Sequence, residues 1–447
     1  MARQPVNIIG AGLAGSEAAL YLADKGFGVR LFEMRPHKMT PAHQSGLPAE
    51  LVCSNSLKST RADTPSGMLK AELRLLGSKL LPIAESCAVP AGHALAVDRD
   101  LFAQKVFEKI QAHPKIELIR EEVTELPDSP GILCSGPLTS DALAASLQKI
   151  LGDTQLYFFD AIAPIVSTDS LDMDRIYSKD RYDKGDPDYL NCAFSREEYY
   201  AFVDALLEGE KHEAHEFENE YFTNLKFTYY ENCMPVEELA KRGRDTLRHG
   251  VMRPMGLERD GVKPFAVLQL RTENQVRNAY NLVGCQTMLR YGEQKRIFRL
   301  IPGLEKAEFL RYGSIHRNSY LNAPELFNPN LTLKPRPDFY VAGQLGGVEG
   351  YMESIATGLL VAKIHAESLQ LLPPETILGQ LWRRLIDPTM GKFQPVNANF
   401  GLLPALEPPI RDKKAKKLAL AERGLTALQD FLNPDKASGL PVSEQMP

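Results

Sequence analysis

The chain has 447 residues, 44% of them hydrophobic, and a formal net charge of −5 at pH 7. This length and composition predict a globular protein of two or three domains. No run of 18 apolar residues occurs, so the sequence supports neither a membrane span nor a cleavable signal peptide, and we expect a cytoplasmic protein. The six cysteines show no CxxC spacing, which argues for reduced thiols and against a metal site.

The first 33 residues predict a dinucleotide-binding unit. An apolar strand, VNIIG, leads into Gly10, Gly12 and Gly15, which have GxGxxG spacing. An alanine-rich helix follows, and the next strand, VRLFE, ends on Glu33. In this motif the glycines allow the turn, the approach of a pyrophosphate and close helix packing, while the phosphates lie at the helix N-terminus. Glu33 has the spacing expected of a carboxylate that binds ribose hydroxyls.

The segment LVCSNSLKS, residues 51–59, places a thiol soon after this unit. Cys53 has serines, an asparagine and Lys58 as sequence neighbours, and reactive cysteines occur in polar, cationic surroundings of this kind. Most free cysteines are buried and inert. We expect that ordinary role for four of the others, which are Cys87, Cys134, Cys192 and Cys285.

The middle of the chain predicts a different kind of unit. From residue 167 the alternation of strands and helices lapses, and aromatic-rich segments favour antiparallel strands in an α+β insertion. One segment there, residues 241–253, is strongly basic, and further basic clusters occupy 290–299, 311–317 and 411–417. A single such cluster is more often a solvated face, but several in one half of the chain favour RNA binding. The predicted RNA contacts are Lys241, Arg242, Arg244 and Arg248.

A second glycine-rich junction between a strand and a helix occurs at residues 338–358. Two such junctions, remote in sequence, suit FAD lying across a sheet and favour FAD over NAD. The predicted FAD contacts at this end are Gly343, Gly346, Gly347, Glu349 and Gly350. We therefore predict an α/β fold: a Rossmann-like, glutathione-reductase-like FAD-binding domain formed by residues 1–166 and 311–447, with an α+β substrate domain inserted at 167–310.

Several motifs, in order along nearly the whole chain, resemble the bacterial folate- and FAD-dependent tRNA uracil-5-methyltransferases. They are GAGLAGSEAA, LVCSNSLKS, ALAVDR, YYENCMPVEELAKRG, MRPMGL, AVLQLR and GQLGGVEGYMESIATG. The resemblance implies that a methylene group passes from methylenetetrahydrofolate to C5 of uridine 54 in the T-loop of tRNA. It also implies that NAD(P)H supplies electrons through FAD.

The resemblance also implies that Cys53 and Cys233 both act in catalysis. C5 of uracil is a poor nucleophile, and a thiolate that attacks C6 activates C5 toward an electrophilic methylene. We assign the attack on C6 to Cys233. Cys53 would remove the C5 proton or protect the flavin adduct, and an exchange of the two roles stays open.

Three other readings stay open at this stage. Related flavoproteins act on ribosomal RNA or on wobble uridines of tRNA. A flavin oxidoreductase of small molecules would need the FAD segments without the basic clusters. An RNA-binding flavoprotein without catalysis would need the basic clusters without the thiols.

Overall fold

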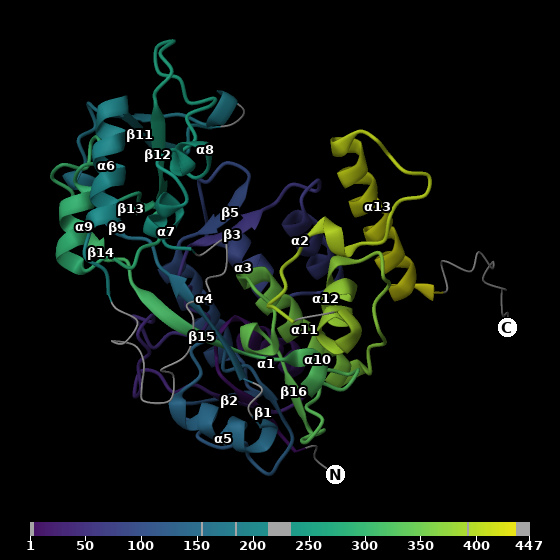
Figure 1. Ribbon diagram of the computed structural model, residues 1–447. Coiled ribbons are helices and arrows are strands. Elements are labelled where there is room, and N and C mark those ends of the chain that lie inside the picture. Colours follow the sequence, from purple (N-terminus) through teal and green to yellow (C-terminus); the bar gives the residue numbers. More distant parts are fainter. Residues whose placement is uncertain (1–3, 153–154, 184–185, 213–233, 391–392, 435–447) are drawn as a thin grey trace.

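The computed structural model describes residues 4–152, 155–183, 186–212, 234–390 and 393–434. Two hydrophobic cores organise these residues. The larger core draws on the N-terminal part of the chain and on residues after 320, and the smaller one lies between Val166 and Ala307. Figure 1 shows the two parts side by side, with the purple N-terminal and green-yellow C-terminal segments together in one of them.

A five-stranded sheet forms the centre of the first part, and all its neighbouring strands are parallel. Each of the five strands has three or four residues, of which at most one is polar or charged, as expected for strands covered on both faces. In spatial order the strands are β16 (Phe339–Val341), β7 (Gly131–Leu133), β1 (Val6–Ile9), β2 (Val29–Phe32) and β6 (Ile116–Ile119).

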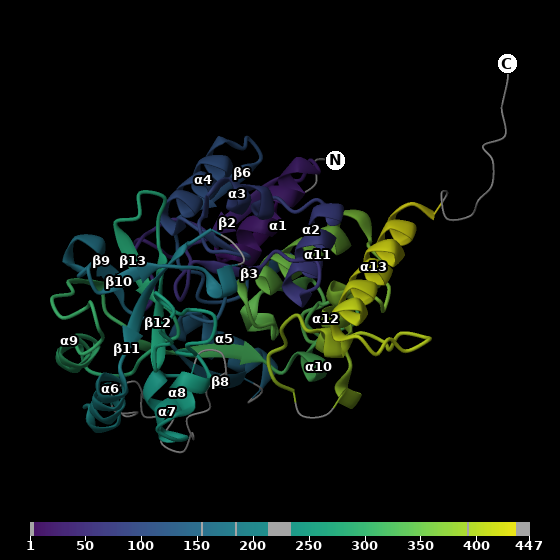
Figure 2. The same cartoon turned by 90° about the horizontal axis from the view of Figure 1, so that it is seen from above.

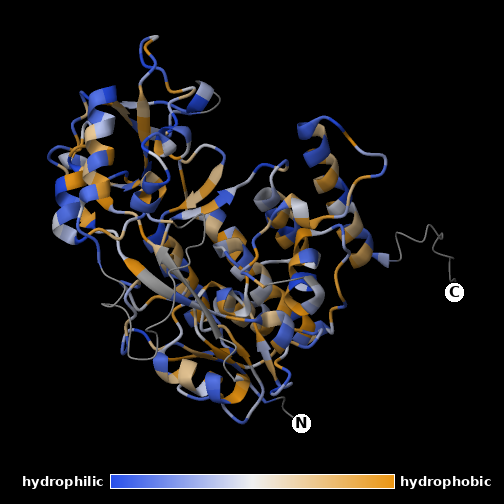
Figure 3. Cartoon of the chain, in the orientation of Figure 1, coloured by the Kyte–Doolittle hydropathy of each residue, from blue (hydrophilic) through white to orange (hydrophobic). Residues whose placement is uncertain are grey.

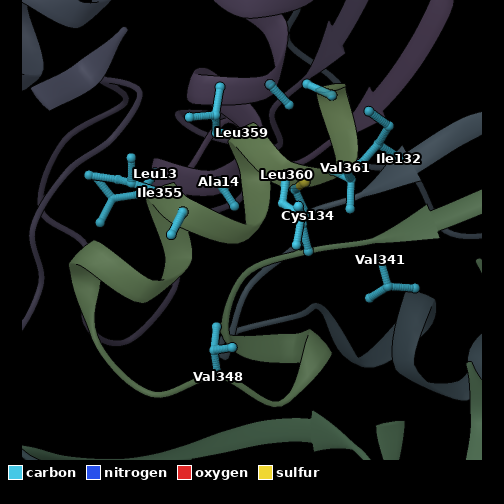
Figure 4. Packing of buried hydrophobic residues seen from close by; sticks show 14 of the residues in the cluster. Leu13, Ala14, Ile132, Cys134, Val341, Val348, Ile355, Leu359, Leu360 and Val361 are labelled. Atoms are coloured by element: carbon cyan, nitrogen blue, oxygen red, sulfur yellow. The ribbon is translucent and has the colours of Figure 1, made fainter. Parts of the chain in front are cut away.

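Helices α1 (Leu13–Asp24) and α11 (Tyr351–Glu367) pack against each other beside this sheet. Figure 4 shows Leu13 and Ala14 of α1 next to Ile355 and Leu359 of α11. A side chain at Gly358 would clash with the backbone of Ala14, so the two helices approach this closely only because residue 358 is glycine. The contact brings the two glycine-rich junctions of the sequence together.

The insertion has a six-stranded sheet in which all neighbouring strands are antiparallel. Its strands, in spatial order, are β10 (Ile176–Ser178), β11 (Tyr189–Phe194), β12 (Ala266–Thr272), β13 (Ala279–Leu282), β9 (Ile165–Ser167) and β14 (Phe309–Arg311). Its helices are α6 (Arg196–Glu208), α7 (Val236–Lys241), α8 (Thr246–His249) and α9 (Tyr291–Phe298). The predicted bounds of the insertion, 167–310, fall within β9 and β14, the strands by which the chain enters and leaves this sheet.

The remaining elements surround the central sheet, as the view from above in Figure 2 shows. The strands are β3 (Ser56–Ser59), β4 (Ala88–Val89) and β5 (Ala94–Val97) in a small antiparallel sheet, and β8 (Gln155–Ala161) paired with β15 (Ile315–Leu321). The α-helices are α2 (Pro65–Leu76), α3 (Leu80–Ser86), α4 (Arg99–Ala112), α5 (Asp141–Leu151), α10 (Ala323–Leu326), α12 (Ile377–Ile386) and α13 (Lys413–Leu432). Short 3-10 turns occupy Thr168–Ser170, Arg181–Asp183, Gln344–Gly346, Pro388–Met390 and Phe400–Leu402.

Figure 3 shows hydrophobic residues in the strands and inner helices, with hydrophilic residues over the outer surfaces. Within the described ranges, each helix is either too short or too polar to cross a membrane.

Candidate active site

A cavity of about 1000 Å³ lies at the carboxyl ends of the parallel strands. Ile9, Phe32 and Gly343 line it from the ends of three strands, and Leu13 and Tyr351 line it from the beginnings of α1 and α11. Ligands of open α/β folds bind at this edge of the sheet.

The N-terminus of α1 faces this cavity and forms an anion-binding position. Gly12 is the N-cap of α1, and no side chain caps the first turn. A Cβ atom built at Gly12 meets no atom within 4 Å, whereas one at Gly15 would clash with the carbonyl oxygen of Gly10. The free N–H groups of the first helical turn and the helix dipole favour a phosphate here. Of the three motif glycines, Gly10 and Gly12 line the cavity, and Gly15 packs behind it.

Glu33 lines the cavity, and it is also the centre of a buried ion pair. Arg35 donates from its backbone N and its Nε to Glu33 Oε1, at 3.0 and 2.9 Å. The backbone N of Ala11 and Nη2 of Arg35 both donate to Glu33 Oε2 at 3.2 Å. Arg35 also donates from Nη1 to Glu50 Oε2 at 3.0 Å. A ribose hydroxyl at Glu33 would therefore bind a carboxylate whose charge Arg35 already balances. The sequence did not reveal Arg35 as a partner of Glu33.

At the second glycine-rich junction, only Gly343 of the predicted residues lines the cavity. Gly347 and Gly350 have positive φ angles of 95° and 122°, a backbone conformation that favours glycine. Side chains at these two positions would meet the ring of Phe393 and the carboxylate of Glu353. Gly346 and Glu349 are not cavity-lining, and Glu349 accepts a hydrogen bond from Gln344 at 2.6 Å. These four residues shape the turn that leads into α11.

The Cys53 loop is attached to the first residue of α11. The backbone N–H groups of Cys53 and Ser54 both donate to the hydroxyl oxygen of Tyr351, at 2.9 and 3.1 Å. Burial, and next the charge of Cys53, raise the pKa of Tyr351, so this hydroxyl stays protonated. Cys53 is partly exposed, and its Sγ lies 3.8 Å from the carbonyl oxygen of Ala161. Because Val52 and Tyr351 line the cavity, the thiol sits beside it.

Two arginines place positive charge near Cys53. Arg99 is largely buried; it donates from Nη1 to the carbonyl oxygen of Leu51 at 3.0 Å and from Nε to Glu273 at 2.7 Å. Burial would lower the pKa of Arg99, but the Glu273 carboxylate outweighs it and the pKa is raised. Arg311 is affected differently, because burial and then the charge of Arg99 lower its pKa. Both arginines interact electrostatically with Cys53.

A buried hydrogen-bond network joins the Cys53 loop to the insertion domain. Arg271 of β12 donates from Nε to Asn55 Oδ1 and from Nη2 to Ser54 Oγ, both at 2.8 Å. Asn55 in turn donates to the carbonyl oxygens of Val97 and Thr272, at 3.1 and 2.9 Å. Asn55 is fully buried and Arg271 is 8% exposed. Asn55 lies more than 200 residues from both Arg271 and Thr272 in the chain. Only the fold therefore shows that these residues hold the Cys53 loop.

The other cysteines divide into two groups. Cys87, Cys134, Cys192 and Cys285 are buried, as predicted. Burial raises the pKa of Cys134, Cys192 and Cys285, which keeps these thiols protonated and unreactive. Cys233, the predicted nucleophile, lies outside the described residues, so its catalytic role stays a prediction.

The predicted RNA contacts lie at the end of α7 and in α8. Three of them already have partners within the insertion domain. Lys241 pairs with Glu238 at 2.6 Å, Arg244 pairs with Asp204, and the Arg248 guanidinium lies 3.9 Å from the ring centroid of Phe265. The side chains of Lys241 and Arg244 remain half exposed. RNA phosphates would have to compete with these surface pairs, and the role of Arg242 likewise stays a prediction.

Comparisons with known proteins decide the family. Residues 5–371 match the family described as glucose inhibited division protein A. A relative from Syntrophomonas wolfei, named methylenetetrahydrofolate–tRNA-(uracil-5-)-methyltransferase TrmFO, is 52% identical over 436 residues, which are 96% of this chain and 98% of the relative. A Bacillus subtilis protein of the same name is 48% identical over 96% of this chain and 99% of its own length. The chain belongs to this family of methyltransferases.

Solved structures agree with the TrmFO assignment at the level of the fold. Aquifex aeolicus GidA superposes with a TM-score of 0.66 in one crystal form and 0.65 in another, at 14% sequence identity in both. The matches cover 99% and 97% of this chain and 80% and 76% of the GidA chains. The likeness confirms the predicted Rossmann-like α/β fold of a GidA-type protein.

Proposed function

We propose that this chain transfers a one-carbon unit from methylenetetrahydrofolate to C5 of a uridine in tRNA, with FAD as its cofactor. The observation that carries the proposal is the meeting of the Cys53 loop and α11 at the dinucleotide cavity. A thiol beside the proposed cofactor cavity supports the proposal, because folate-dependent uracil methylation needs a thiol near a redox cofactor. The names of relatives that are 47–52% identical over nearly their whole length support the reaction and the substrates.

The residues of the cavity fit FAD. The open space at Gly12 and the uncapped start of α1 suit a pyrophosphate, and Glu33 stands where ribose hydroxyls bind. Gly343 and Tyr351 would flank the opposite part of the cofactor. When bound, FAD supplies the redox chemistry that converts the donated methylene into a methyl group.

The two thiols react with the uracil ring. A thiolate adds to C6, C5 then bonds to the one-carbon unit, and loss of the C5 proton lets the thiolate leave and restores the C5–C6 double bond. We assign the attack on C6 to Cys233 and the removal of the C5 proton to Cys53. Arg99 and Arg311 interact electrostatically with Cys53, which would act as the base. The Tyr351 hydroxyl holds the backbone of this loop in place.

The finer assignments go beyond the names of the relatives. We assign uridine 54 of the T-loop as the target and NAD(P)H as the reductant. A tRNA substrate also accords with the predicted cytoplasmic location. Lys241, Arg242, Arg244 and Arg248 are proposed to contact phosphates once RNA displaces their surface partners.

One experiment tests the function. The purified yellow protein is incubated with an unmodified tRNA transcript, methylenetetrahydrofolate and NADH or NADPH, and the methyl group is mapped by mass spectrometry. We expect 5-methyluridine at position 54, and a transcript with cytidine at position 54 should stay unmodified. Methylation of ribosomal RNA alone, or turnover of a small molecule without RNA, would instead support one of the alternative functions.

A further inference from the structure

Two basic segments of the sequence, 290–299 and 311–317, meet in the insertion domain through stacked aromatic rings. Tyr291 begins α9 and Tyr312 directly follows β14, and Figure 1 shows α9 and β14 next to each other. The ring centroids of the two tyrosines lie 5.1 Å apart, with 29° between the planes. Tyr312 also stacks on Phe309, at 5.2 Å and 12°. These three residues form what we call the ring stack.

The ring stack is fixed at one end and open at the other. Phe309 packs against the hydrophobic core of the insertion domain. Tyr291 is 56% exposed, although aromatic rings usually bury much of their surface. The ring of His212 contacts Tyr291 edge-on, at 6.0 Å and 73°. An aromatic surface held in a fixed orientation and open to solvent suits a flat, π-bonded ligand.

Basic residues flank Tyr291, the exposed end of the ring stack, along the chain. Residues 290–299 carry four basic side chains and one acidic one. The acidic residue, Glu293, pairs with Arg296 at 2.6 Å. Arg290 is 3.7 Å from Glu210, a carboxylate that is itself 75% exposed, and exposed pairs of this kind contribute little. Lys295 is exposed and forms no ion pair with another described residue. The charge therefore favours an anionic ligand.

The ring stack is also close in the chain to the proposed active site. Arg311, the neighbour of Tyr312, donates from Nη2 to the carbonyl oxygen of Ala42 in the FAD-binding domain, at 3.0 Å. The same guanidinium interacts electrostatically with Cys53 and Tyr351. The residue next to Tyr312 in the chain therefore reaches the FAD-binding domain and interacts with the Cys53 thiol.

We propose that the ring stack binds an unpaired base of the RNA substrate, with Arg290 and Lys295 contacting the adjoining phosphates. This inference rests on the proposed function and names the surface that holds the RNA loop. Unpaired bases stack on protein aromatic rings, whereas the bases of a duplex are covered by their neighbours. The loop of a tRNA arm provides both the free base and the phosphates.

The first test measures binding of the holoenzyme to unmodified tRNA between 50 and 200 mM salt, with the variants Tyr291→Ala, Tyr312→Ala and the corresponding Phe variants. Loss of a stacked base weakens binding by about five- to 100-fold, so we expect that loss for each Ala variant and near-normal affinity for each Phe variant. The salt dependence should not change. Arg290→Gln or Lys295→Gln should instead lower the slope of log K against log salt by about 1.

Leu310→Ala is the matched control. Leu310 lies in β14, two residues before Tyr312, is 58% exposed and has no aromatic ring. Flavin content and melting temperature show whether each variant is folded. A cross-linking test needs no variant: tRNA with 4-thiouridine in its T-loop should, on irradiation, link to a peptide that contains Tyr291 or Tyr312. Single-stranded polyuridylate should compete for this link, and duplex RNA of equal length should not.

Three outcomes would overturn the inference: Ala variants that bind within twofold of the wild type, equal losses in the Ala and Phe variants, or cross-links confined to other peptides. If the wild-type protein methylates tRNA but shows any of these results, only the ring stack is refuted. If the wild-type protein fails to methylate tRNA, the proposed function itself is wrong.

Discussion

At the scale of single residues, Cys53 gives the most direct test of the chemistry. Its thiol lies beside the cavity and interacts electrostatically with Arg99 and Arg311. We expect Cys53→Ala to slow methyl transfer by at least about 100-fold, the usual effect of losing a general base. The tRNA dissociation constant should stay unchanged. Cys285→Ala, at a buried thiol remote from this chemistry, is the control and should keep most of the activity.

The division of roles between the two thiols can be read from a trapped adduct. RNA with 5-fluorouridine at the target cannot lose fluorine as a cation, so a thiol bound at C6 stays attached. We expect peptide mapping to find the adduct on Cys233. Cys233→Ala should abolish it, and Cys53→Ala should retain it. An adduct found on Cys53 would mean that the two roles are exchanged.

Arg271 acts on Cys53 from a distance, as a positioning residue. Its two hydrogen bonds, to Asn55 and Ser54, hold the loop that carries the thiol. A lysine cannot form this pair of contacts with one planar group, so we expect Arg271→Lys to lower kcat by about tenfold and leave the tRNA dissociation constant unchanged. The alkylation rate of Cys53 by iodoacetamide, measured against pH, should also change. Arg259→Lys, at an exposed site, should leave that pH profile as in the wild type.

At the scale of elements, the start of α1 separates a cofactor effect from a folding effect. A side chain at Gly12 enters open space, whereas one at Gly15 would meet the backbone of Gly10. We expect Gly12→Val to fold, with a loss of about 1 kcal/mol from the poorer N-cap, but to purify without flavin absorbance. Gly15→Ala should lower the melting temperature of the apoprotein. A yellow, folded Gly12→Val protein would contradict the placement of the pyrophosphate.

Two other helices begin on buried carboxylates, and these make stability depend on pH. Glu17 accepts from the backbone N–H groups of Lys79 and Leu80 at α3, and Glu72 accepts from those of Ile377 and Leu378 at α12. Burial raises the pKa of each carboxyl to about 7, although the backbone donors oppose this shift.

An acid with a raised pKa holds its proton in the folded state at a pH where the unfolded chain has lost it. The folded protein therefore loses stability as the pH rises from about 4.5 to 7, by at most about 3 kcal/mol per group. Glu72→Gln removes this contribution, so we expect its melting temperature relative to the wild type to improve between pH 5 and pH 8. A difference that is constant with pH would mean that Glu72 is ionised throughout. Glu85→Gln, at an exposed surface pair, should show no such trend.

At the scale of the whole molecule, the sequence predicted what depends on local patterns. The glycine spacing and apolar runs of residues 6–33 predicted a strand, a helix and a strand, and the structure has β1, α1 and β2 there. The change of pattern after residue 166 predicted an antiparallel insertion, which the structure confirms. Nothing local could reveal Arg271 beside Asn55, Tyr351 beside Cys53, or Arg35 balancing Glu33. Such contacts exist only when the tertiary fold joins distant segments.

The ring stack illustrates the same limit. The sequence marks residues 290–299 and 311–317 as basic. The predicted RNA contacts, however, all lie within residues 241–248, where arginines are most frequent. In the structure Lys241 and Arg244 are engaged with acidic neighbours, whereas Tyr291 and Tyr312 join the two other segments. Charge density along a chain does not show which cations remain available after folding. Ring contacts between elements do not show in composition at all.

The two hydrophobic cores are joined by buried polar contacts, which predicts how the whole molecule unfolds. Besides Arg271 with Asn55, Arg99 pairs with Glu273, and at the exposed surface the backbone N of Gln275 donates to Asp98. FAD would contact only the FAD-binding domain, which holds the larger core. Its binding would therefore stabilise the insertion domain only if these contacts make the two domains unfold together. We expect the wild-type holoprotein to unfold in one calorimetric transition.

Removing these contacts should separate the two cores. We expect the double variant Arg271→Leu, Asn55→Leu to show two transitions, because it removes the Arg271–Asn55 pair and also the donors to Ser54, Val97 and Thr272. Added FAD should raise only the transition of the larger core, since a ligand stabilises the unit that binds it. A single transition that FAD still raises as a whole would show that other contacts couple the domains. The position of the Cys53 loop would then depend less on β12 than the hydrogen bonds indicate.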